Sequence, residues 1–182
     1  VPGIYRERYN MEPAVAVLLA PGVTLPAGVS FQHFQTQFPA ARFEASNAVF
    51  TTLRHVRRWN GSSSSAGQEV DAGYTLRAAT RTLDSDFVYT RHSADARYAA
   101  RYGPHFVTVR AEGGLISGMA PLYERFALGD SRTLRGWNKF DIDPLGGSRA
   151  VHGSVQYRYR WIGTFYDAGS VWDRNENVKG RH

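Results

Sequence analysis

The chain has 182 residues, with 22 Lys and Arg against 16 Asp and Glu for a net charge of +6. This length suits one domain or part of a larger one, and it excludes a multidomain enzyme. The absence of cysteine excludes a disulfide scaffold, a thiolate zinc site and a cysteine nucleophile. Because 20 of the 22 basic residues are Arg, accompanied by 18 Gly and 24 aromatic residues, the composition favours β structure with a polar face.

The first part of the chain contains a long uncharged stretch, residues 13–41, which contains no Asp, Glu, Lys or Arg. It does not predict a transmembrane helix, because Pro21 and Pro26 interrupt it and polar residues follow. A membrane-spanning helix needs about 20 consecutive apolar residues. The start at Val1 shows no basic region followed by an apolar stretch, so no signal peptide is visible.

Further along the chain, apolar and polar residues alternate with a period of two, which predicts β-strands with one apolar and one charged face. In the clearest case Val155, Tyr157 and Tyr159 alternate with Gln156 and Arg158. Turn signals rich in Gly, Ser, Asp and Pro separate the segments. The predicted strands are residues 47–59, 69–82, 94–102, 106–113 and 151–161.

Two features favour a membrane barrel over a soluble β-sandwich, which would show similar alternation. The predicted strands approach or exceed the ~9–11 residues that a tilted strand needs to cross a bilayer. Their apolar faces are rich in Tyr, Trp, Ala, Gly and Val, as expected for a surface that contacts lipid. The charged faces would then line a wet lumen. The sequence therefore predicts an all-β, transmembrane antiparallel β-barrel.

The alternation stops in a long segment, residues 118–148, which contains Leu134-Arg135-Gly136-Trp137. Phe165, Asp167 and Gly169 follow with one residue between each. Together, in this order, the two motifs resemble the Arg-Gly-aromatic and Phe-x-Asp-x-Gly signatures of the Omp85 superfamily of outer-membrane barrels. The resemblance covers residues 104–172. It points to the bacterial surface-antigen branch that includes the assembly proteins BamA and TamA.

The residues of the two motifs suggest how a loop is held inside the barrel. If Phe165, Asp167 and Gly169 share the lumen face, the Asp167 carboxylate needs a cation there, and Arg135 can supply a planar, forked pair. Gly136 would permit a tight turn, and Trp137 would pack against the wall or Phe165. In the family the same Arg-to-Asp contact holds the loop, often with a Glu on the intervening strand as second partner. The corresponding position here is Gln156.

The resemblance implies that residues 1–182 are part of a single barrel domain, supplying about eight strands of a barrel of about sixteen. Residues 118–148 would form a long extracellular loop folded into the lumen, and the connection at residues 161–163 would be a periplasmic turn. The chain would be incomplete on its own. The implied function is non-enzymatic, namely assembly of proteins into the bacterial outer membrane or protein translocation across it.

The expected partners are outer-membrane lipid, client β-barrel or secreted proteins, and periplasmic POTRA-type modules upstream. Two alternatives are a barrel that anchors or exports a fused passenger, such as a patatin-like lipase, and a soluble β-sandwich binding module. No cofactor is expected. No metal site is expected either, because the histidines form no close cluster. Nucleic-acid binding is not expected, because the Arg residues alternate with acids instead of forming one basic stripe.

Overall fold

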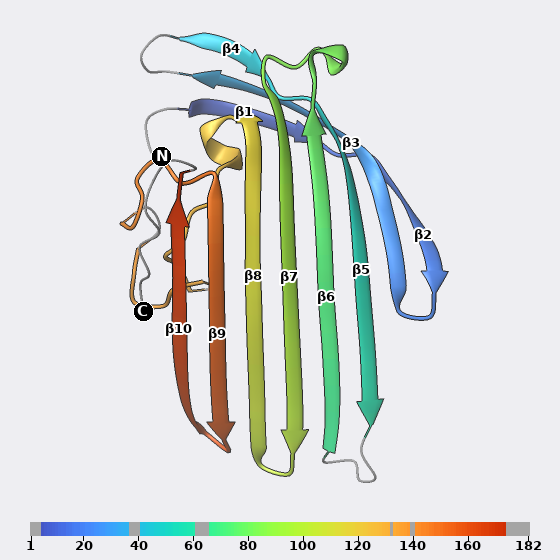
Figure 1. Ribbon diagram of the computed structural model, residues 1–182, viewed down its shortest axis with the longest axis vertical. Coiled ribbons are helices and arrows are strands. Elements are labelled where there is room, and N and C mark those ends of the chain that lie inside the picture. Colours follow the sequence, from blue (N-terminus) through green and yellow to red (C-terminus); the bar gives the residue numbers. More distant parts are fainter. Residues whose placement is uncertain (1–4, 37–40, 61–65, 132, 139–140, 174–182) are drawn as a thin grey trace.

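The computed structural model describes residues 5–36, 41–60, 66–131, 133–138 and 141–173. These residues form one antiparallel sheet of ten strands in the spatial order β1, β3, β5, β6, β7, β8, β9, β10, with β2 and β4 paired to β3 (Figure 1). The strands are β1 (Tyr5–Met11), β2 (Ala14–Ala20), β3 (Val23–Thr36), β4 (Arg42–Ala45), β5 (Ala48–Asn60), β6 (Ala66–Ala79), β7 (Val88–Tyr102), β8 (His105–Met119), β9 (Arg149–Tyr159) and β10 (Ile162–Trp172). Two short 3-10 helices lie in connections, η1 (Arg81–Leu83) and η2 (Leu122–Glu124).

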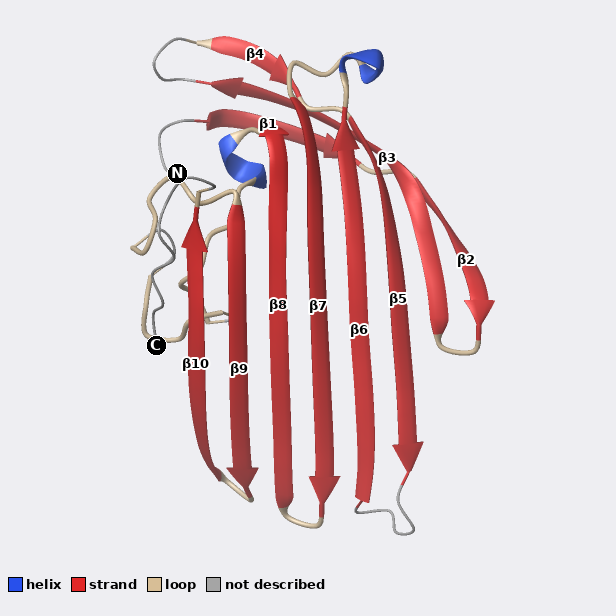
Figure 2. Cartoon of the chain, in the orientation of Figure 1, coloured by secondary structure: helices blue, strands red, loops and turns tan. Residues whose placement is uncertain are grey.

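Strands β5 to β10 form consecutive antiparallel neighbours, which Figure 2 shows side by side as the main body of the sheet. Each alternating segment of the sequence overlaps one of these strands. The boundaries differ, because β7 begins earlier than predicted and β8 continues through a Gly pair to Met119. Arg81 lies in η1 instead of the predicted strand, since β6 ends at Ala79. Likewise β9 ends at Tyr159, two residues before the predicted strand end at Trp161. The turn begins at Arg160, which adopts φ of 51°.

The N-terminal part contains strands that the hydrophobic pattern did not predict. β2 is exposed on both faces and is apolar throughout, so it carries no alternation to detect. β1 and β2 are separate strands that both pair with β3, and Pro13, which cannot donate a backbone hydrogen bond, lies between them. In Figure 1 β1, the end of β3, and β4 run across the upper end of the sheet. Together with β4, this region raises the strand count to ten, against about eight expected.

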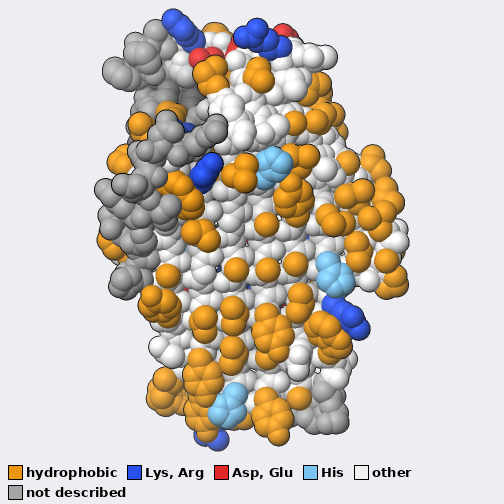
Figure 3. All heavy atoms as spheres, viewed as in Figure 1, with side chains coloured by type: hydrophobic (Ala, Val, Ile, Leu, Met, Phe, Trp, Pro, Cys, Tyr) orange, Lys and Arg blue, Asp and Glu red, His pale blue; other side chains and the backbone are white. Residues whose placement is uncertain are grey.

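The two faces of the sheet differ in chemistry. The face that carries Val155 and Tyr166, here called the outer face, exposes large apolar and aromatic side chains from every strand between β5 and β10. Figure 3 shows such side chains spread across the strands with few charged groups between them. An apolar surface of this extent is not expected to face water. Its exposed residues include Val49, Leu53, Trp59, Tyr74, Tyr98, Val109, Leu115, Val151, Val155, Tyr157 and Tyr166.

The opposite face, here called the inner face, carries Asp167 and most of the charged side chains of the strands. Cross-strand pairing places these charges beside one another, with Arg54–Asp71 at 2.5 Å, and with Arg58 and Arg97 at 2.5 Å and 2.7 Å from Glu69. Pairs of this kind stabilise neighbouring strands and fix their register. The inner face is therefore a polar wall held by its own ion pairs.

The apolar core is small and lies at the upper part of the inner face. One cluster joins Ala48, Ala79, Tyr89 and Ile116, and a second joins Leu128, Leu134, Ala150 and Val171. Phe126 packs against both clusters. The second cluster contains residues of the connection between β8 and β9, so this connection is part of the core.

The sheet is open in the described residues, since β10 pairs only with β9 and both β1 and β2 pair only with β3. These residues form a single sheet, so the two packed layers of a β-sandwich are not present in them. In the same part of the chain, no helix has the length and apolar character needed to cross a membrane.

Candidate functional site

The connection between β8 and β9, residues 120–148, is here called the β8–β9 loop; the sequence placed its start two residues earlier, at Gly118. The two ends of the loop are tied together by an antiparallel bridge between Phe126 and Gly147. The Phe126 N–H donates to the Gly147 carbonyl at 2.9 Å, and the Gly147 N–H donates to the Phe126 carbonyl at 2.8 Å. The bridge therefore closes the base of the loop.

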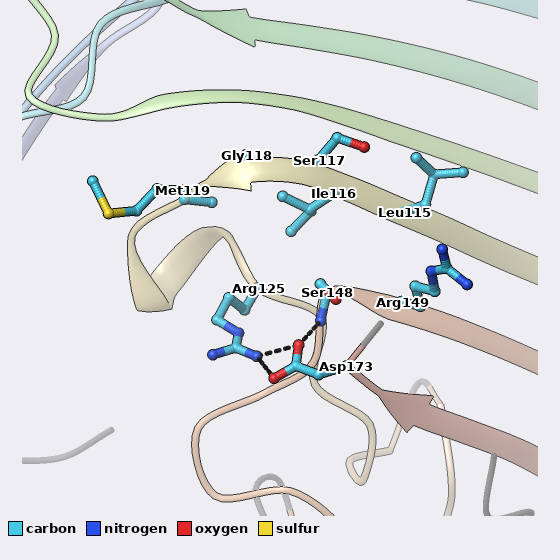
Figure 4. Close-up of a pocket in the computed structure, with 10 residues that line it drawn as sticks. Leu115, Ile116, Ser117, Gly118, Met119, Arg125, Ser148, Arg149 and Asp173 are labelled. Carbon is cyan, nitrogen blue, oxygen red and sulfur yellow. Dashed lines mark hydrogen bonds and ion pairs between the residues drawn. The ribbon is translucent and has the colours of Figure 1, made fainter. Parts of the chain in front are cut away.

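A charged contact fastens this base to the end of β10. Arg125 donates to both carboxylate oxygens of Asp173, and the Ser148 N–H donates to the same carboxylate at 2.9 Å (Figure 4). Burial acts to raise the pKa of Asp173, but the hydrogen bonds from Arg125 and Ser148 outweigh it and hold the pKa below its usual value. One carboxylate thus joins the start of the loop, its end and β10.

The central part of the loop is attached to the inner face through Arg135 and Asp167. The Arg135 Nε and Nη2 groups donate to the two carboxylate oxygens of Asp167 at 2.7 Å and 2.8 Å, and the Arg135 backbone N–H donates to Oδ2 at 3.2 Å. The Asp167 side chain is only 5% exposed, whereas that of Arg135 is 24% exposed. This is a forked, charge-assisted contact of the kind that fixes both distance and orientation.

Neighbouring side chains complete the surroundings of Arg135. Its Nη2 group donates to Ser154 Oγ at 3.2 Å, and Nη1 donates to Gln156 Oε1 at 3.5 Å, so Gln156 is a distant neutral acceptor. The guanidinium lies 3.6 Å from the centroid of the Phe165 ring. The hydrogen bond to Asp167 raises the pKa of Arg135 above its ordinary value, so the guanidinium stays charged.

The other residues of the loop motif play different structural parts. Leu134 is almost fully buried, at 1% exposure, in the second apolar cluster. Gly136 adopts φ of +93°, which favours glycine, while a β-carbon there would meet nothing within 4 Å. Trp137 is 38% exposed. The packing of Trp137 against the wall or Phe165 stays a prediction, while the guanidinium of Arg135 lies over the Phe165 ring.

Two glycines of the wall make room for apolar side chains of the loop. A β-carbon at Gly114 of β8 would lie 2.3 Å from the ring of Phe126. A β-carbon at Gly169 of β10 would lie 2.9 Å from Leu128 Cδ1. Such distances are shorter than van der Waals contact, so only glycine admits these side chains without a shift of the loop. This gives Gly169 of the second motif a packing role.

The sequence placed Arg135, Gln156, Phe165 and Asp167 at one site, and the structure brings these four together. Two contacts were not predicted from the sequence: that of Arg125 with Asp173, and that of Phe126 with Gly114. A Gly inside a strand often marks the close approach of another chain segment. The pair at positions 113–114 lies at the end of the predicted strand 106–113, and it becomes such a signal only because β8 continues to Met119. The carboxylate of Asp173 had no comparable signal, because it lies beyond the alternating pattern.

The site contains ion pairs and apolar packing, and its contacts suit attachment of a loop. In the described part of the chain, no group of three or more His, Asp or Glu is arranged to hold a metal ion. A cavity of about 650 Å³ lies between the loop and the wall, lined by residues that include Arg91, Asp95, Glu112 and His152. The arrangement holds the loop against the inner face.

Comparison with known proteins agrees with the motifs. A family model described as an Omp85 superfamily domain matches residues 28–182, which is most of the chain. The match includes both motifs and every residue of the site, and it confirms the resemblance inferred from Arg135 and Asp167. A search of curated proteins finds no match.

Proposed function

Because this chain belongs to the Omp85 superfamily, we propose that it forms part of an outer-membrane β-barrel that inserts other proteins into the membrane or passes them across it. Family membership suggests outer-membrane protein assembly or translocation, and barrels of this family are generally non-enzymatic. The family likewise implies an outer-membrane location. The finer proposal places the protein in the bacterial outer membrane, in the branch of BamA-like and TamA-like assembly proteins.

The attachment of Arg135 to Asp167 is the observation that carries this proposal. It fixes a long loop to the charged inner face, while the outer face presents apolar and aromatic groups. In a barrel, that outer face contacts lipid and the inner face lines the lumen. The loop then lies inside the lumen, in position to control how the wall responds when a client strand approaches.

The partners that follow from this proposal are outer-membrane lipid, unfolded client β-barrels or secreted proteins, and periplasmic modules of the POTRA type. The β8–β9 loop would be extracellular, and the short turn at Arg160 and Trp161 would be periplasmic. Barrels of this class have short periplasmic turns and longer outer loops, which supports this orientation.

The test is reconstitution of the full-length protein into liposomes, followed by addition of an unfolded outer-membrane barrel as client. We expect the protein to accelerate client insertion relative to bare liposomes, measured as the appearance of a heat-modifiable band. Arg135→Ala should slow insertion, whereas Arg158→Ala should not. Arg158 is a matched control because it is another arginine of the inner face, one residue before the end of β9, and its guanidinium lies 5.1 Å from the centroid of the Phe106 ring.

Two outcomes would contradict the proposal. If the wild-type protein left the insertion rate unchanged for several unrelated clients, assembly would be excluded. If the protein instead displayed only a passenger domain encoded in its own chain, the barrel would serve as an anchor or exporter.

A further inference from the structure

The first turn of the β8–β9 loop contains a buried carboxylate that neither motif includes. Glu124, at the end of η2, has a side chain that is only 10% exposed, and it lies between two Arg side chains of the inner face. Its Oε1 atom lies 3.7 Å from Nη1 of Arg77 on β6, and its Oε2 atom lies 3.9 Å from Nε of Arg91 on β7. Arg91 also donates to the Glu124 backbone carbonyl at 3.0 Å. A carboxylate so deeply buried is costly unless it is paired.

This carboxylate belongs to a longer line of alternating charges. Arg77 donates through Nη2 to Glu12 at 2.6 Å and through Nη1 to Ser30 at 2.8 Å. Gln32 of β3 donates to Glu124 Oε1 at 3.5 Å. Because negative Glu12 and Glu124 alternate with positive Arg77 and Arg91, the set is neutral. Removing the charge of Glu124 would leave two arginines facing each other across the β6–β7 pair.

The residues that flank Glu124 are attached as well. The Tyr123 ring makes an edge contact with Phe34 of β3, with ring centroids 5.0 Å apart, and Arg8 of β1 lies 4.4 Å from the Tyr123 centroid. On the other side, the Arg91 guanidinium lies 4.5 Å from the Phe126 centroid. The first turn of the loop therefore contacts β1, β3, β6 and β7.

Three apolar side chains lie between this turn and the Arg135 attachment. Phe126 packs against both apolar clusters, while Leu128 and Leu134 form part of the second one. Between them, the Gly129 N–H donates to Thr133 Oγ1 at 3.0 Å. Closely packed groups have little room to deform independently, so a shift of Phe126 is expected to disturb the packing of Leu128 and Leu134.

We propose that Glu124 is a second positioning residue of the loop, which binds its first turn to β6 and β7 while Arg135 binds its central part to β10. The two attachments have opposite charge arrangements. The loop supplies the carboxylate at the Glu124 attachment and the guanidinium at the Arg135 attachment. The loop then links β6 and β7 to β10 across the inner face, and the two attachments stabilise each other. This inference rests on the proposed function only for its effect on client insertion.

The test is amide hydrogen exchange in the full-length protein, comparing wild type with Glu124→Gln. The reporters near Glu124 are the amides of Glu124 and Phe126, which donate to Pro121 and Gly147. The reporters at the far attachment are the amides of Arg135 and Trp137. Glu124→Gln keeps the size of the side chain and removes its charge. We expect exchange to become about tenfold faster or more at both sets of amides, because neutralising one partner of a buried ion pair leaves its arginines uncompensated.

The matched control is Glu69→Gln, the same substitution at another carboxylate of the inner face. Glu69 pairs with Arg58 and Arg97, so it also loses two Arg contacts, without contacting the loop. It should leave loop exchange unchanged. Arg91→Gln removes the partner instead and should loosen the loop as Glu124→Gln does, which provides a second variant if the first does not assemble. Glu124→Asp retains the charge and should restore most of the protection.

Three results decide the matter. Unchanged exchange at Phe126 in both Glu124→Gln and Arg91→Gln would overturn the role of Glu124. Faster exchange at Phe126 alone, with Arg135 and Trp137 unaffected, would overturn the mutual stabilisation. If both regions loosened while client insertion proceeded at the wild-type rate, the positioning role would stand and the role proposed for the loop in client insertion would fail.

Discussion

Leu128 of the β8–β9 loop packs directly on Gly169 of β10, where a β-carbon would lie 2.9 Å from Leu128 Cδ1 and 3.0 Å from the Val151 carbonyl oxygen. The residue two positions earlier in β10 is Asp167, which binds Arg135. A single inner-face stretch of β10 therefore receives both an apolar and a charged side chain of the loop. This accounts for the spacing of the Phe-x-Asp-x-Gly motif, because residues two apart in a strand point to the same face.

Gly169→Ala should displace Leu128 and weaken loop docking by about 1–3 kcal/mol, the usual cost of overpacking a filled site. The measurement is the difference in amide protection of the loop between variant and wild type. Gly153→Ala on β9 is the control, because a β-carbon there would have ordinary space, 3.9 Å from the Arg110 carbonyl oxygen. Equal effects of the two substitutions would refute the packing explanation.

Arg135→Ala and Asp167→Ala should each destabilise the docked loop by about 1–3 kcal/mol. This lies between the values for a fully buried and an exposed ion pair, because Asp167 is 5% exposed and Arg135 is 24% exposed. Since both substitutions remove the same contact, the double variant should be little worse than either single one. The exchange rate of the Trp137 amide measures loop docking in the two single variants and the double variant. Additive effects would show that the two residues act independently.

Gln156→Glu should strengthen the attachment, because a carboxylate pairs with guanidinium more strongly than an amide does. Gln156 Oε1 already accepts from Arg135 Nη1 at 3.5 Å, so the new carboxylate is placed to bind. Gln156→Met, which has similar size and no strong acceptor, should weaken the attachment slightly. Protection of the loop from protease should therefore decrease from Glu to Gln to Met at position 156, and any other order would contradict a direct contact.

The base of the loop should tolerate mild acid. Burial acts to raise the pKa of Asp173, but the hydrogen bonds from Arg125 and Ser148 outweigh it and hold the pKa below its ordinary value of 3.8. A carboxyl whose folded pKa is lowered contributes stability above its unfolded pKa and loses it as pH falls through the folded pKa. Protection of the Phe126 amide, corrected for intrinsic exchange, should thus be constant from about pH 5 to 8 and decrease below about pH 4. Asp173→Asn should lower the protection of the Phe126 amide at neutral pH. It should also remove the part of the decrease below about pH 4 that arises from protonation of Asp173.

The proposed orientation can be tested by cysteine labelling, because the chain contains no native cysteine. Leu145 in the β8–β9 loop is 51% exposed, and Trp161 in the opposite turn is 86% exposed. In intact cells a membrane-impermeant maleimide should label Leu145→Cys and not Trp161→Cys, whereas both should react after lysis. Labelling of Trp161→Cys alone in intact cells would reverse the proposed orientation.

The sequence by itself determined the strands whose two faces differ in polarity, because a period of two survives in the residue order. It also determined the family, since Arg135 and Asp167 stand in motifs that are local in the chain. It did not reveal β2, whose apolar residues face both sides and leave no alternation. The predicted strand ends were imprecise for a different reason, because glycines and turn residues interrupt the alternation there.

Only the tertiary structure decided which distant residues meet. Glu124 lies 33 positions after Arg91 and 47 after Arg77 in the chain, and their contacts depend on β6 and β7 lying side by side beneath the loop. The fit of Phe126 on Gly114 and of Leu128 on Gly169 likewise depends on the path of the loop across the sheet. These contacts arise from the register of several strands together, and local residue order carries no direct record of that register.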